Sequence, residues 1–122
     1  MKRHKILIID DDKDILKVLK KRLEECHYEV IGAQEGYEGL YKYSKEKPDL
    51  IILDIMLPRI DGYEVCREIR REIKDEKTPI IMLTAKGDDY DRIKGKVIGA
   101  TYYRTKPFEW DDVHKLITQL LN

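Results

Sequence analysis

The chain has 122 residues, of which 42% are hydrophobic and 39% charged, and its 24 basic and 24 acidic side chains leave no formal net charge. This length predicts a single domain over residues 1–122, and the charge balance excludes a global basic field for binding nucleic acid or anionic membranes. Its apolar runs are too short for a membrane span or a signal peptide, so we expect a cytoplasmic protein with Cys26 and Cys66 reduced.

The first half of the chain alternates apolar runs with helical periodicity. Residues 5–9 (KILII) predict a buried strand, and apolar residues at helical spacing then predict a helix over 12–26 with Asp12 as its N-cap. A β-rich segment at 28–33 and a helical segment at 37–47 repeat this order.

The second half continues the alternation. A fully apolar run at 50–55 precedes a helix predicted over 62–76, for which Asp61 is the expected N-cap. Another apolar run follows at 79–83, and then a weak helix at 88–99 that contains Gly95. The last two predicted elements are a strand over 100–105 and an amphipathic helix over 109–121.

Five strands alternating with five helices are typical of a parallel α/β sheet. The central runs are apolar at every position, which indicates strands covered by helices on both faces. We therefore predict a doubly wound (βα)5 sandwich. In such open sheets ligands bind outside the carboxyl ends of the strands, so the residues just after each strand are the candidates for function.

Five polar residues occupy those strand ends: Asp10, Asp11, Asp54, Thr84 and Lys106. Any one of them alone could be structural, but an aspartate within an apolar run is costly unless it is paired or takes part in chemistry. Clustered carboxylates without histidine or cysteine favour Mg²⁺. A hydroxyl and an ammonium suit the oxygens of a phosphoryl group, and an aspartate can itself accept one.

The motifs IIDDD (8–12), LDIMLPRIDG (53–62), TAK (84–86) and TKPF (105–108) stand in order along this frame. With them the chain resembles, over essentially its whole length, the receiver domain of two-component response regulators. The resemblance implies a flavodoxin-like sheet with strand order 2-1-3-4-5. It also implies a regulatory domain rather than an enzyme, which catalyses only its own phosphorylation and dephosphorylation.

The resemblance also implies residue roles. Asp54 would accept the phosphoryl group from a phosphohistidine, and Mg²⁺ would be held by Asp10, Asp11, Asp54 and the backbone carbonyl of Met56. Lys106 would pair with the phosphoryl oxygens and form a cis peptide with Pro107. Thr84 and Tyr103 would act as the switch pair.

The implied partners are a sensor histidine kinase or histidine phosphotransfer protein, and an output domain or target protein. The output would be read from the face formed by the helix at 88–99, the strand at 100–105 and the helix at 109–121. On this face Thr101, Tyr102 and Arg104 depart from the pattern of many DNA-binding regulators, and Leu116 replaces an expected arginine. The charge pairs by which those DNA-binding regulators dimerise through this face are therefore not expected in the same form. The chain could be a monomer or a phosphorylation-dependent dimer.

Two other classes compete with this interpretation. A haloacid-dehalogenase-like phosphatase would use Asp10 as its nucleophile, with Asp12, Thr84 and Lys106 in supporting roles. The phosphatase pattern requires threonine or valine where this chain has Asp14. It also requires an acidic pair after a late strand, which this chain lacks. A phosphorylation-independent interaction domain is the third class, and the intact set of strand-end residues argues against it.

Overall fold

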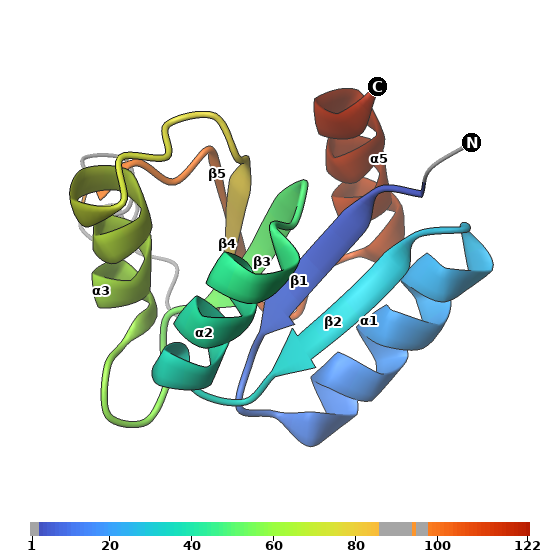
Figure 1. Cartoon of the computed structure of the whole chain (residues 1–122). Helices are drawn as coiled ribbons and strands as arrows, with labels where there is room; N and C mark the ends of the chain where they lie inside the picture. Colours follow the sequence, from blue (N-terminus) through green and yellow to red (C-terminus); the bar gives the residue numbers. More distant parts are fainter. Residues whose placement is uncertain (1–2, 86–93, 95–97) are drawn as a thin grey trace.

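The computed structural model describes residues 3–85, 94 and 98–122. Its centre is a parallel sheet in the order β2-β1-β3-β4-β5, as predicted (Figure 1). The strands are β1 (Lys5–Ile9), β2 (Glu29–Ala33), β3 (Leu50–Asp54), β4 (Ile80–Thr84) and β5 (Tyr102–Thr105). The helices are α1 (Lys13–Glu25), α2 (Gly36–Glu46), α3 (Gly62–Arg67), the π-helix η1 (Glu68–Glu72) and α5 (Trp110–Leu121). The helix predicted over 88–99 lies largely outside the described residues.

Helices cover both faces of the sheet, which explains the uninterrupted apolar runs. Side chains of α1 and α5 share one core cluster with alternate residues of the central strands, and those of α2 and α3 share the other. Every residue of β3 is buried. Because all strands are parallel, their carboxyl ends meet at a single rim. In the part of the chain that the structure describes, no helix is both long and apolar enough to cross a membrane.

Both predicted helix caps are confirmed. The carboxylate of Asp12 accepts hydrogen bonds from the backbone N–H groups of Asp14 and Ile15, at 2.9 and 3.3 Å. The carboxylate of Asp61 accepts one from the N–H of Glu64 at 3.0 Å. Each bond satisfies an amide that the first helical turn leaves unpaired, so the caps fix where α1 and α3 begin.

The single helix predicted over 62–76 is wrong in its second half. The α-helix ends at Arg67 and continues as the π-helix η1 to Glu72, where the N–H of Ile73 bonds to the carbonyl of Glu68. The wider turn rotates later residues off the core face. Ile73, which continues the apolar stripe in the sequence, is therefore 44% exposed, whereas Ile69 is fully buried.

The strand predicted over 100–105 begins two residues later than expected. Thr101 lies just before β5, and there its hydroxyl accepts a hydrogen bond from the N–H of Ile80 while its own N–H donates to the Ile80 carbonyl. The side chain thus replaces a ladder bond, and regular pairing with β4 starts at Tyr102. Both cysteines are free, as predicted.

Candidate functional site

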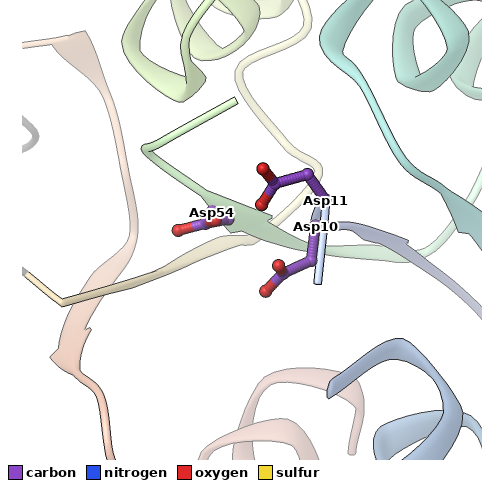
Figure 2. Close-up of side chains that lie close together, drawn as sticks. All are labelled: Asp10, Asp11 and Asp54. Carbon is purple, nitrogen blue, oxygen red and sulfur yellow. The ribbon is translucent and has the colours of Figure 1, made fainter. Parts of the chain in front are cut away.

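Three carboxylates lie together at the carboxyl ends of neighbouring strands. Asp10 and Asp11 directly follow β1, and Asp54 is the last residue of β3, which pairs with β1. One oxygen of each side chain lies within 4.8 Å of the others (Figure 2). Asp10 and Asp54 are buried, at 2% and 4% exposure, whereas Asp11 is exposed. The acidic residues that the sequence predicted to converge are therefore in one cluster.

Lys106 reaches this cluster from the end of β5. Its ammonium nitrogen Nζ lies 2.9 Å from Oδ2 of Asp10 and 3.5 Å from Oδ1 of Asp54. The peptide bond between Lys106 and Pro107 is cis, as expected from the resemblance. One cation thus bridges the two buried carboxylates, which would otherwise repel each other across a region of low dielectric constant.

The electrostatic environment of Asp54 disfavours its charged form. Burial and the neighbouring charge of Asp10 raise the pKa of Asp54 to about 6, although Lys106 and the backbone N–H of Met56 act in the opposite direction. Burial lowers the pKa of Lys106, but its hydrogen bond to Asp10 and the charges of both carboxylates outweigh this effect and raise it above its usual value. The ammonium therefore stays charged at neutral pH.

Gly62 packs against the backbone of Asp54 and Ile55, a role that was not predicted from the sequence. Its N–H donates to the carbonyl of Ile55 at 2.8 Å. A Cβ atom at this position would lie 2.3 Å from the carbonyl oxygen of Asp54 and 2.8 Å from Cα of Ile55. Since only a residue without Cβ allows the start of α3 to approach the end of β3 this closely, Gly62 fixes the backbone that carries Asp54.

The remaining predicted site residues lie in or shortly after strands β3, β4 and β5. Thr84 is the last residue of β4, and Tyr103 is a buried residue of β5 at 8% exposure. Met56 follows β3 closely and is 55% exposed. The structure does not test the switch roles of Thr84 and Tyr103 or the carbonyl ligand of Met56, so these remain predictions.

The residues that depart from the DNA-binding pattern have partners within the chain. Arg104 donates from Nε to Asp112 at 2.9 Å and its guanidinium lies 5.5 Å from the ring centre of Tyr102. Arg104 is partly buried, whereas Tyr102 is 37% exposed. Leu116 is only 6% exposed and packs in the core, so its position presents no charge on this face.

The carboxylate cluster fits a hard divalent cation. Its donors are all oxygens, and in the described residues no histidine or cysteine joins the group. Burial and the charge of Asp10 both raise the pKa of Asp54, and a bound cation would offset both effects by stabilising the carboxylate. Asp11 is the exposed member, so one side of the cluster is open to solvent.

The raised pKa of Asp54 predicts a stability difference that depends on pH. Because the folded-state pKa of about 6 exceeds the usual aspartate pKa of 3.8, the folded state binds this proton more tightly. That contribution is present at low pH and is lost as the pH rises through about 6. In EDTA, raising the pH from about 4 to 8 should destabilise the native chain by up to about 3 kcal/mol relative to Asp54→Asn.

Urea unfolding of both proteins across this pH range measures the difference. The Asn variant keeps every other titratable residue of the chain, so it serves as the matched control. Adding Mg²⁺ at pH 8 should stabilise the native chain and have little effect on the variant. Parallel stability curves for the two proteins in EDTA would show that Asp54 titrates normally.

Comparisons with known proteins agree with this geometry. Residues 6–118 match the family model described as the response regulator receiver domain. The chain is 44% identical over 117 residues to the alkaline phosphatase synthesis transcriptional regulatory protein PhoP of Bacillus subtilis, covering 96% of this chain and 48% of that protein. The chain thus spans about half the length of such curated relatives.

Two solved structures share the fold over almost the whole chain. A putative response regulator from Chloroflexus aurantiacus has a TM-score of 0.91 at 39% identity, with 98% of each chain covered. The BeF3-activated N-terminal receiver domain of Klebsiella pneumoniae RstA has a TM-score of 0.90 at 28% identity, with 98% of this chain and 99% of that one covered.

Proposed function

The chain belongs to the response regulator receiver domain family of two-component systems, and we propose that it works as a phosphorylation switch with Asp54 as the phosphoacceptor. Receiver domains are regulatory, and no observation favours the phosphatase alternative with Asp10 as nucleophile. We further propose that residues 1–122 form one domain whose phosphorylation state controls an output domain or a partner protein.

The observation that carries the proposal is the position of Asp54 between a carboxylate cluster and Lys106. Its oxygen Oδ1 lies 3.5 Å from the Lys106 ammonium, and its side chain belongs to the set of three acids within 4.8 Å. An attacking carboxylate needs neighbours that neutralise the incoming phosphoryl oxygens. The ammonium of Lys106 supplies one such positive charge. The acidic cluster supplies the ligands for a second one, a bound Mg²⁺ ion.

Each residue then has a distinct part in the transfer. Asp10, Asp11 and Asp54 would hold Mg²⁺, together with the Met56 carbonyl that the family pattern implies. When bound, the ion supplies charge neutralisation between the acids and the phosphoryl oxygens. Asp54 attacks phosphorus with a carboxylate oxygen, and the bond to the donor's histidine nitrogen breaks. Lys106 moves from its ion pair with Asp10 toward the new phosphoryl oxygens.

The phosphodonor has to dock close to this rim. An apolar groove of about 200 Å³ lies beside it, lined by Asp14, Ile15, Val18, Leu19 and Phe108. Phe108 stands two residues after Lys106, and Val18 is 57% exposed. We expect a sensor histidine kinase or a histidine phosphotransfer protein to place an apolar surface in this groove.

The output is proposed to be read from the β5–α5 side. Tyr103 on β5 is the switch aromatic implied by the family pattern, with Thr84 linking it to the phosphoryl group. Arg104 is hydrogen-bonded to Asp112 within the chain. An interface on this side would therefore have to break this ion pair or leave it at the solvent-exposed border of the interface. A partner that uses the exposed ring of Tyr102 is compatible with that pair.

Treatment with acetyl phosphate tests the proposal. In the presence of Mg²⁺ the native chain should gain one phosphoryl group by intact mass spectrometry, and hydroxylamine should remove it as expected of an acyl phosphate. EDTA should prevent the gain, because the acids and the phosphoryl group then repel each other without a cation. Phosphorylation that proceeds equally in EDTA, or no phosphorylation with Mg²⁺, would contradict the proposal.

A further inference from the structure

The free edge of β2 lies between α1 and α2, at the opposite end of the sheet from β5 (Figure 1). The Glu29 N–H and the Ala33 carbonyl both bond toward the β1 side, to His4 and Asp10. Residues of a parallel strand alternate in the side to which their N–H and C=O point. The N–H and C=O groups of Val30 and Gly32 therefore point outward, away from β1.

One of these four outward groups has a partner among the described residues. The Lys42 ammonium on α2 donates to the Gly32 carbonyl at 2.7 Å and lies 3.2 Å from Glu38. The Gly32 N–H and both groups of Val30 have no partner in the part of the chain that the structure describes. They form a short row of backbone donors and an acceptor that an added strand could pair with.

A groove of about 810 Å³ runs along this edge, lined by Ile8, Lys13, Leu16, Lys17, Lys20, Val30, Ile31, Gly32, Gln34, Glu38 and Lys42. Its α1 wall carries Lys13, Lys17 and Lys20, which are all exposed. None of these three lysines has an ion pair within 4.0 Å among residues 3–85, 94 and 98–122. Lys13 and Lys17 are four residues apart, a spacing at which like charges destabilise a helix.

We propose that this groove binds an extended acidic peptide segment of a partner protein, which adds to β2 as a further strand. Its backbone would pair with Val30 and the Gly32 N–H, and alternate side chains would point toward the α1 wall. Equivalent side chains on one face of a strand repeat every ~7 Å, close to the ~6 Å rise between Lys13 and Lys17. Carboxylates at that spacing would neutralise lysines that have no ion pair in the part of the chain that the structure describes.

A labelled peptide of alternating Glu and Thr tests this site by fluorescence anisotropy at low ionic strength. Two matched peptides separate strand pairing from charge: one has the same composition with its Glu residues in a block, and one is N-methylated at alternate amides. We expect the alternating peptide to bind about tenfold more tightly than either, since only it offers both a free backbone edge and spaced carboxylates. Equal binding of all three, or no binding, would overturn the proposal.

Protein variants provide the second arm. Lys17→Gln with Lys20→Gln should weaken binding by about tenfold. Lys115→Gln removes one exposed lysine on α5 that does not line the groove, and it should change binding by less than about twofold. Binding should protect the Val30 and Gly32 amides from hydrogen exchange. It should persist in Asp54→Asn, which separates this site from the phosphorylation switch. Unchanged affinity in the double variant, or protection confined to other amides, would contradict strand addition at β2.

Discussion

Replacing Asp54 with asparagine is expected to abolish incorporation of a phosphoryl group from acetyl phosphate with Mg²⁺. The amide has nearly the same shape as the carboxylate but lacks the anionic oxygen that attacks phosphorus. Asp54 is 4% exposed and lies 3.5 Å from Lys106, so the change removes the nucleophile without opening a cavity. Intact mass spectrometry of both proteins after the same treatment measures the effect.

Asp12→Asn is the matched control because it makes the same change at an acid that directly follows Asp10 and Asp11 in the sequence but does not belong to the carboxylate cluster. Asp12 caps α1, and asparagine is an equally good cap, so the fold should be preserved. We expect this variant to be phosphorylated like the native chain. Equal phosphorylation of the Asp54→Asn variant and the native chain would show that another residue accepts the phosphoryl group. Loss of phosphorylation in the Asp12→Asn variant would show that Asp12 shares the role of Asp10 and Asp11.

Replacing Gly62 with alanine is expected to destabilise the protein by about 3 kcal/mol, because the new methyl group meets backbone that cannot rotate away. Its Cβ would lie 2.3 Å from the Asp54 carbonyl oxygen, 2.8 Å from Ile55 Cα and 3.0 Å from the Asp54 carbonyl carbon. Relief requires the end of β3 to move, and that movement displaces Asp54 relative to Lys106. The folded fraction should therefore also be phosphorylated more slowly.

Gly32→Ala provides the matched comparison. A Cβ there would lie 3.7 Å from a methyl carbon of Leu16, which is an ordinary van der Waals contact. We expect a change in unfolding free energy within about 1 kcal/mol and no effect on phosphorylation. Urea unfolding and the initial rate of phosphoryl gain are the two readouts. Similar stabilities for the two alanine variants would show that β3 yields to the methyl group without cost.

The elements themselves follow from local patterns in the sequence. Uninterrupted apolar runs predicted strands buried on both faces, and Asp12 and Asp61 were identified as helix caps because a cap depends on neighbours a few residues away. The parallel topology then placed Asp10, Asp11, Asp54 and Lys106 at one rim. This inference needed only the direction of the strands, and the ion pairs of Lys106 with Asp10 and Asp54 agree with it.

The tertiary structure alone decided features that depend on distances between segments far apart in the chain. The close approach of Gly62 to Asp54, the preference of Lys106 for Asp10 and the groove along β2 are set by packing and strand register. The π-helical turn of η1 was also beyond reach, since the apolar stripe continues through Ile73 in the sequence. Periodicity specifies which side of an element is buried. It contains no information about how closely two backbones approach each other. That approach determines the distances between the site residues and, through burial and neighbouring charges, the pKa of Asp54.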